Sequence, residues 1–174
     1  MNFRYIECTN TNQLVQNFYE LTVEQTSIPL VSRVIPTAQS HILFFKSKSP
    51  LETGVRNKIY KNKGIVVFGQ SYKSYTMKAH NPYFNFGINL HPTALYKILK
   101  TDISKLTDKH ISLSKIDTKL YDLLCPVFKE NLKGTALAKR IENQLQKLEV
   151  YESKNTKLVD EAVKLIYKKE GKIN

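Results

Sequence analysis

The hydrophobic periodicity of this chain changes once, close to His91–Pro92. Before that point, short apolar and aromatic runs are separated by turn residues, which is typical of β-strands. After it, apolar residues recur at the three- and four-residue spacings of amphipathic helices. We therefore predict an α+β protein: a curved, mainly antiparallel β-sheet or partial barrel over residues 1–91, followed by about four helices over residues 92–174.

Four runs in the first part of the chain have the composition of strands. Residues 40–45 and 64–69 are apolar runs bounded by Ser, Lys, Asn and Gly, as in strands that are buried on one or both faces. Tyr72–Lys78 and Tyr83–Leu90 alternate in polarity instead, and the residues between them, 79–82, are turn formers. We predict that these two alternating strands form a hairpin.

The alternation within Tyr83–Leu90 divides its side chains between two faces, because successive residues of a strand point in opposite directions. One face is apolar and comprises Phe84, Phe86, Ile88 and Leu90. The other comprises Tyr83, Asn85 and Asn89. Aromatic residues on one side of a curved sheet can enclose an apolar ligand, and buried amides there would need partners.

The candidate ligand-binding residues on this basis are Phe44, Tyr75, Tyr83, Asn85 and Asn89. The same aromatic residues also suit an ordinary hydrophobic core, and that interpretation stays open for each of them. A third interpretation is a surface on which the bases of single-stranded nucleic acid stack, for which Lys73 with Tyr75 is the clearest local pairing.

The helical part begins near Pro92, a residue that suits the first position of a helix. Asp117 is expected to cap a second helix, in which Pro126 should cause a kink or an early end because proline lacks an amide hydrogen. Two further helices are predicted at about residues 135–149 and 156–169, with Gly171 ending the last one.

The last two predicted helices present more apolar surface than a small sheet can cover. Exposed apolar stripes usually indicate association, so we predict a homodimer that forms through a helix near the end of the chain. The candidate dimerisation residues are Ile141, Leu145, Leu148 and Ile166.

The formal net charge of +12 comes mainly from lysines, which are scattered along the chain. Arginine is better suited to bidentate contacts with phosphate or guanine, and only Arg4, Arg33, Arg56 and Arg140 are present. We interpret most of the lysines as solvated surface. A stand-alone basic domain that binds nucleic acid is nevertheless the leading alternative function.

The chain lacks the sequence motifs of common enzymes, including the GxSxG elbow, the phosphate-binding glycine loop and HExxH. Cys8 and Cys125 lie far apart, which fits free thiols in a reducing compartment. We predict no enzymatic activity, no cofactor and no metal. A metal-dependent β-barrel enzyme, with His41, His80 and His91 around the metal, is the third hypothesis.

No apolar run approaches the roughly 18 residues of a membrane span, and the first residues contain no continuous apolar stretch of signal-peptide length. We therefore expect a cytoplasmic protein that has no membrane partner.

From Ile65 onward the order of motifs resembles the amino-terminal domain in one branch of the AraC-type bacterial transcription regulators. Val67–Gln70 is similar to that family's Val/Gly/Gln strand end, and Gly87–Ala94 is similar to its Gly-Ile-Arg-Phe-x-Pro-Gly-Gly strand. Ile103–Asp108 resembles the family's Leu-Thr-Asp turn. Val159–Ile166, followed by Gly171–Asn174, resembles the helix that precedes the double helix-turn-helix domain.

Two departures from the family pattern affect the expected ligand. Asn89 stands where the family usually has Arg, and Thr93–Ala94 replace two glycines. An arginine that anchors an acidic ligand cannot be carried over to position 89, so the pocket should have a different specificity. Residues 35–40 match the family's Pro-Asp-Gly turn only loosely.

The resemblance implies an effector-sensing and dimerising domain of a transcription regulator. Its expected partners are a small-molecule effector and a second copy of the chain. Contact with DNA would be made only through a helix-turn-helix domain beyond residue 174, and effector binding would shift the population of helix arrangements that position it.

Overall fold

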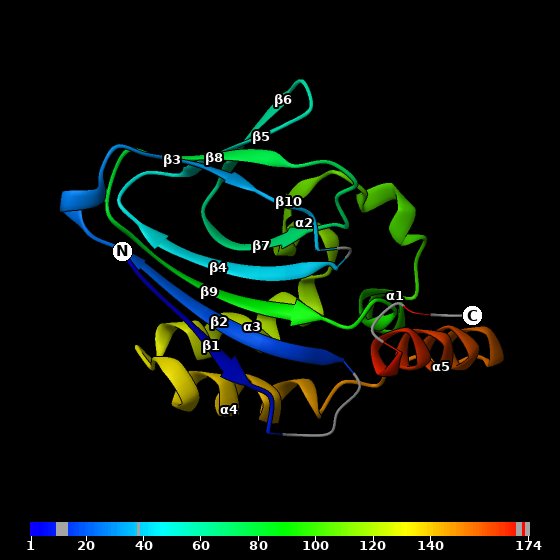
Figure 1. Cartoon of the computed structure of the whole chain (residues 1–174). Helices are drawn as coiled ribbons and strands as arrows, with labels where there is room; N and C mark the ends of the chain where they lie inside the picture. The colour runs from blue at the N-terminus through cyan, green and yellow to red at the C-terminus, as the bar shows by residue number, and fades with distance from the viewer. Residues whose placement is uncertain (10–13, 38, 170–171, 173–174) are drawn as a thin grey trace.

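Two antiparallel sheets dominate the computed structural model, which describes residues 1–9, 14–37, 39–169 and 172 (Figure 1). Within these residues the first sheet has six strands in the order β1-β2-β9-β4-β7-β10, and the second has four in the order β3-β8-β5-β6. The six strands of the first sheet are β1 (Asn2–Glu7), β2 (Val15–Val23), β9 (Tyr83–Leu90), β4 (His41–Ser47), β7 (Gly64–Phe68) and β10 (His110–Ser112). The strands of the second are β3 (Leu30–Val34), β8 (Tyr75–Ala79), β5 (Leu51–Val55) and β6 (Lys58–Asn62).

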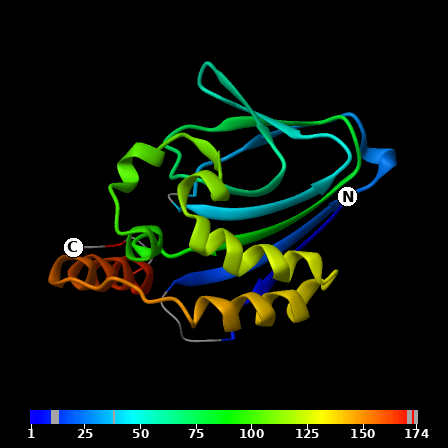
Figure 2. The same ribbon diagram turned by 180° about the vertical axis from the view of Figure 1, so that it is seen from behind.

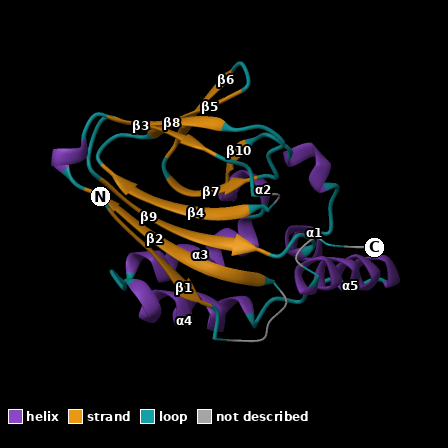
Figure 3. Cartoon of the chain, in the orientation of Figure 1, coloured by secondary structure: helices purple, strands orange, loops and turns teal. Residues whose placement is uncertain are grey.

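Helices follow the sheets, which confirms the predicted α+β class (Figure 3). The α-helices of the described residues are α1 (Ala94–Leu99), α2 (Leu113–Ile116), α3 (Thr118–Lys129), α4 (Gly134–Leu145) and α5 (Lys154–Lys168). Two short 3₁₀ helices cover Gln25–Ser27 and Ile103–Leu106. The helical part also contains β10, a strand of three residues that is too short to leave a periodicity in the sequence.

The predicted hairpin between the two alternating strands is wrong. β8 pairs with β3 and β5 in the second sheet, whereas β9 lies between β2 and β4 in the first. The residues between them therefore cross from one sheet to the other. β9 is buried on both faces, as a central strand is, whereas β8 alternates between half-buried and exposed residues.

The predicted division of β9 into two faces is confirmed. Phe86, Ile88 and Leu90 belong to the core between the first sheet and the helices, and Tyr83 belongs to the core between the two sheets. Figure 2 shows α3 and α4 lying across the outer face of the first sheet. The first sheet is thus covered on both sides, by helices on one and by the second sheet on the other.

The start of α3 confirms the Asp117 cap, since the Asp117 carboxylate accepts a hydrogen bond from the Leu120 amide at 2.8 Å. Pro126 does not shorten the helix, which continues to Lys129. Proline in the last turn removes only one backbone hydrogen bond, and Val127 and Phe128 are buried against the core. The predicted end of the last helix at Gly171 lies outside the described residues.

The apolar stripe of α4 is already covered within the chain. Ile141 and Leu145 are fully buried in the core, and Leu148 is half-buried against it. Ile141 and Leu145 are therefore not available to a partner, which corrects the prediction that they form a dimer interface, whereas the predicted role of Leu148 stays a prediction. The sequence pattern could not show that the sheet is wide enough to cover α4.

α5 behaves differently, because its apolar residues remain exposed. Leu158, Leu165 and Ile166 are exposed to between 45% and 54%. α5 lies beside α1 (Figure 1), and polar contacts join α5 to α1 and to its N-cap residue. The ammonium of Lys97, which is only 1% exposed, lies 2.6 Å from an oxygen of Asp160 on α5, and the Thr93 hydroxyl donates to the same carboxylate.

Candidate ligand-binding site

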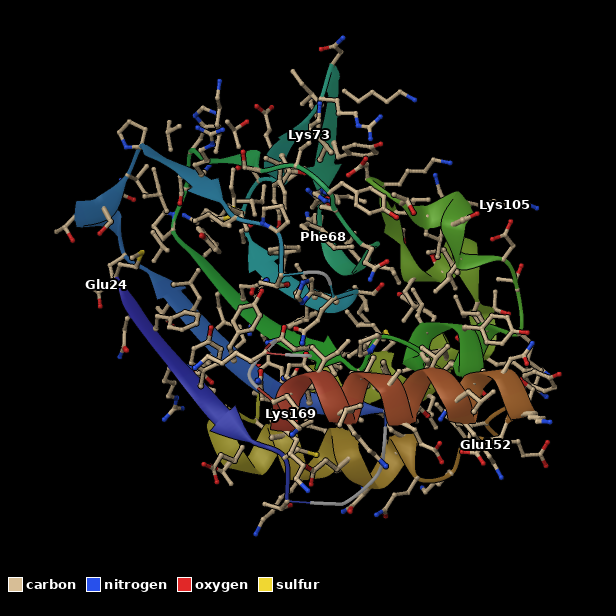
Figure 4. The ribbon with its side chains drawn as sticks, turned by 45° about the vertical axis from the view of Figure 1, so that its right-hand side comes forward. Glu24, Phe68, Lys73, Lys105, Glu152 and Lys169 are labelled. Carbon is tan, nitrogen blue, oxygen red and sulfur yellow. The ribbon has the colours of Figure 1, made fainter. Side chains whose placement is uncertain are left out.

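A cavity of about 230 Å³ lies between the two sheets. Its floor is the inner face of β1, β2, β9, β4 and β7, and its opposite wall is formed by β8 and by residues 34–37, which are the end of β3 and the segment after it. Phe68 of β7 reaches into this interior from the floor (Figure 4). A cavity at this position is lined by side chains from many separate parts of the sequence.

The walls of the cavity are mainly aromatic and aliphatic. The rings of Phe45 and Phe68 are 6.0 Å apart, and the Tyr75 ring meets Phe68 edge-on with centroids 6.1 Å apart. Leu43 and Met77 complete the apolar surface on β4 and β8. Such walls favour a flat apolar ligand.

One row of polar side chains crosses the floor, because Asn17, Asn89 and His41 stand directly opposite one another on β2, β9 and β4. The Asn89 amide donates to the Asn17 side-chain oxygen at 2.6 Å, and the Asn89 oxygen lies 2.7 Å from His41 Nδ1. The His41 Nε2 lies 3.2 Å from the Thr37 hydroxyl. Since Asn89 offers an oxygen to Nδ1, that nitrogen must carry the proton, and the Thr37 hydroxyl then donates to Nε2.

Burial lowers the pKa of His41, although its hydrogen bond with Asn89 partly offsets this effect. The imidazole is therefore neutral near pH 7. A neutral histidine satisfies both neighbours in this row, because it donates from one nitrogen and accepts at the other. The row is thus a chain of hydrogen bonds between uncharged side chains, and it orients the Asn89 amide.

Tyr83 is another polar residue that lines the cavity. Its residue is 3% exposed, and its hydroxyl has no hydrogen-bond partner among the described residues. Burial raises the pKa of Tyr83 to about 12, so the phenol stays neutral. A buried hydroxyl without a partner is uncommon in folded proteins, and a ligand group could satisfy it.

The space in the cavity depends on Gly87 of β9. The ring of Tyr19, from β2, lies across this glycine, and a Cβ atom at position 87 would be 2.0 Å from Tyr19 Cε1. Gly87 therefore allows the Tyr19 ring to lie flat against the sheet instead of occupying the cavity. Burial raises the pKa of Tyr19 as well.

A family model described as a domain of unknown function, DUF6597, matches residues 8–112, which is more than half of the chain. The chain belongs to the DUF6597 family. The matched span includes all of the strands that form the cavity except β1. No curated protein matches this DUF6597 chain.

Among solved structures, the AraC-like transcriptional activator CuxR is distantly similar to the DUF6597 chain. The sequence identity is 15% and the TM-score is 0.37, over 92% of this chain. The chain spans 60% of the CuxR chain. A similarity at this level carries no functional conclusion, and the AraC-type role stays a prediction.

The structure brings together four of the five predicted ligand-binding residues of the DUF6597 chain. Tyr75, Tyr83, Asn85 and Asn89 all line the cavity. Phe44 does not, because alternation along β4 turns it toward the helices, where its ring stacks on Phe128 with centroids 4.4 Å apart. Since Phe44 and Phe45 are both aromatic, the sequence did not indicate which of them faces inward.

Sequence reasoning missed His41, Tyr19 and Phe68 as lining residues. His41 and Phe68 stand at strand ends, where the alternation could have been extended by one residue. Tyr19 lies in residues 12–23, whose apolar spacing fits a short helix as well as a strand.

The hypothesis of a metal site is not supported by the arrangement of the described metal-ligating residues. In the described part of the chain, no three His, Cys, Asp or Glu residues are grouped so that they could hold a metal ion. His41 lies in the polar row, while His80 is 61% exposed and lies 3.9 Å from Glu52 at the surface. The structure thus separates histidines that the hypothesis required to meet.

The proposed pairing of Lys73 with Tyr75 is also not formed. Tyr75 lines the cavity, whereas Lys73 is exposed at the periphery of the molecule (Figure 4). None of the described helices has both the length and the apolar character that are needed to cross a membrane.

Proposed function

We propose that this chain is the ligand-sensing and dimerising domain of an AraC-type transcription regulator. The observation that carries the proposal is the cavity between the sheets, which combines aromatic walls with an oriented amide and a buried hydroxyl that has no partner. Concave apolar sites with a few converging polar groups are the usual form of small-molecule sites. The assignment to the AraC-type regulators is supported by the order of the sequence motifs from Ile65 onward.

Two connections link the cavity to α5. β9 carries Asn89 and leads through residues 91–93 into α1, whose Lys97 is paired with Asp160 of α5. At the far end of α5, the Tyr167 hydroxyl lies 3.4 Å from the side-chain nitrogen of the lining residue Gln39. A ligand that displaces either contact would change how α5 lies against the sheets.

The exposed apolar residues of α5 supply the dimerising surface in this proposal. Ile166 is the predicted dimerisation residue that stays exposed, at 45%. Pairing two copies of α5 would bury its apolar stripe and would place the two chain ends together. Ligand binding would then alter the geometry of the dimer.

A fusion experiment tests this function. Residues 1–174 are joined to a heterologous DNA-binding domain that represses a reporter only as a dimer. We expect the fusion to repress at least tenfold better than the DNA-binding domain alone, and Ile166→Asp to abolish this gain. Ile59→Asp is the matched control, because Ile59 is 74% exposed on β6, away from α5 (Figure 1).

The same reporter tests sensing. Leu21→Trp fills the cavity from β2, so it should mimic occupancy and change repression at least threefold, whereas Ile59→Trp should leave repression unchanged. A fusion that represses no better than the DNA-binding domain alone would overturn the dimerising role. Repression that is indifferent to Leu21→Trp would overturn the sensing role.

A further inference from the structure

The cavity has an unusual electrostatic character for this chain. Among the described residues that line it, none is Lys, Arg, Asp or Glu, although 24% of the residues of the chain are charged and the net charge is +12. His41 and Tyr75, which line it, are neutral near pH 7, because burial lowers the pKa of His41 and raises the pKa of Tyr75 to about 12. A ligand in this cavity meets no opposite charge.

An ionised ligand would therefore bind poorly. Entering the cavity would remove its hydration, and no counter-charge in the walls would compensate for that loss. The polar residues that line the cavity are uncharged and include the amides of Asn85, Asn89 and Gln39, the hydroxyls of Thr37 and Ser71, and Tyr83, whose hydroxyl has no partner among the described residues. Such groups can donate and accept hydrogen bonds, which matches a ligand that does both without carrying charge.

The shape of the cavity limits the ligand further. Aromatic rings from β4, β7 and β8 surround the space, so a planar body can stack on or meet the edges of Phe45, Phe68 and Tyr75. The volume of about 230 Å³ lies below the ~300–1,000 Å³ of drug-sized pockets. A compact ligand built on one ring fits this space.

We propose that the ligand class of this cavity is a small, uncharged aromatic molecule that carries an amide-like group, held by the Asn89 row and the Tyr83 hydroxyl. This inference rests on the proposed ligand-sensing function and specifies its ligand. It excludes aromatic acids and aromatic cations of the same size.

Benzamide, benzoate and benzamidinium are three probes of nearly the same shape that are neutral, negative and positive near pH 7. We expect isothermal titration calorimetry of the whole chain to show benzamide binding at least tenfold more tightly than either ion. Tyr83→Phe should weaken benzamide binding, because it removes the free hydroxyl and leaves the ring in place.

A charge placed in the wall should reverse the order. Met77 lines the cavity on β8 and is half-buried, so Met77→Lys can extend its ammonium into the space while its stem replaces the methionine. In this variant benzoate should bind more tightly than benzamide. Ile59→Lys adds the same charge at an exposed position and should keep the original order, which controls for general attraction of anions to a basic protein.

Benzoate or benzamidinium binding as tightly as benzamide to the unmodified chain would overturn the proposed ligand class. Absence of saturable binding for all three probes would overturn it as well. Neither result changes the outcome of the reporter fusion. The dimerising and sensing roles are therefore tested separately from the ligand class.

Discussion

His110 shows how the environment of a single residue sets its chemistry. Its ring stacks on Phe68 with centroids 3.4 Å apart, its Nδ1 lies 2.6 Å from the Thr53 hydroxyl, and its Nε2 has no partner among the described residues. Burial lowers the pKa of His110 to about 3, and nearby His41 adds to this effect when it is protonated in acid. In the unfolded chain the same ring titrates near pH 6.5.

This difference predicts that the chain loses stability in acid. Between pH 6.5 and about 3 the unfolded chain binds a proton at His110 that the folded chain does not, so the contribution of His110 is complete above pH 6.5 and falls as the pH decreases. His110→Phe should keep the stack on Phe68 but remove the titration. Urea unfolding at pH 7 and pH 4.5 should show the unmodified chain losing about 2 kcal/mol more than the variant between these two conditions.

His80→Gln is the control for this measurement, because His80 is 61% exposed. It should lose as much stability in acid as the unmodified chain. An identical pH dependence in His110→Phe and the unmodified chain would show that His110 does not cause the effect.

Features of a single strand or helix could be predicted where they depend only on the spacing of residues within that element. The two faces of β9 and the Asp117 cap of α3 follow from local spacing, and both are confirmed. The partner of a strand depends instead on the whole sheet, which is why β8 and β9 were wrongly paired. Whether an apolar stripe is buried or exposed also depends on what packs against it: the stripe of α4 is buried, whereas that of α5 is exposed.

The contrast between α4 and α5 gives an expectation for two matched substitutions. Leu145 is 1% exposed in the core, so Leu145→Asp should cost more than about 4 kcal/mol and prevent cooperative unfolding, since it leaves both a cavity and a buried charge. Ile166→Asp should change the free energy of unfolding by less than about 1 kcal/mol, because surface substitutions rarely do more.

Circular dichroism during urea titration measures the stability of both variants, and sedimentation equilibrium measures their association. Ile166→Asp should be folded and monomeric at concentrations where the unmodified chain is dimeric. A stable Leu145→Asp variant would mean that α4 is not held in the core as described. A monomeric unmodified chain at tens of micromolar would contradict the dimer.

At the scale of the whole molecule, the layering places the phenylalanines of β4 and β7 inside and lysines outside. The first sheet lies between the helices and the second sheet, so Phe44, Phe45 and Phe68 face the two interiors, while lysines such as Lys73 and Lys105 lie at the periphery (Figure 4). The sequence shows which residues are aromatic and which are basic. It could not predict that folding would place them in different layers.

This separation predicts weak, charge-driven binding of nucleic acid. A random 30-nucleotide single strand and its duplex should bind with dissociation constants above about 1 μM at about 150 mM salt, and the affinity should fall steeply with added salt, as for non-specific binding. Fluorescence anisotropy at several salt concentrations measures both. Nanomolar binding at that salt concentration would favour the alternative of a stand-alone nucleic-acid-binding domain.

The open space between the two sheets depends on Gly87, which lies beneath the Tyr19 ring. One additional carbon at position 87 would push that ring toward the opposite sheet, because the two atoms would otherwise be 2.0 Å apart. The exterior, the helices and the charge distribution would be unaltered. Gly87→Ala would therefore reduce the space between the two sheets and leave the outer surface of the molecule as it is, so any ligand binding in this cavity depends on the absence of one methyl group.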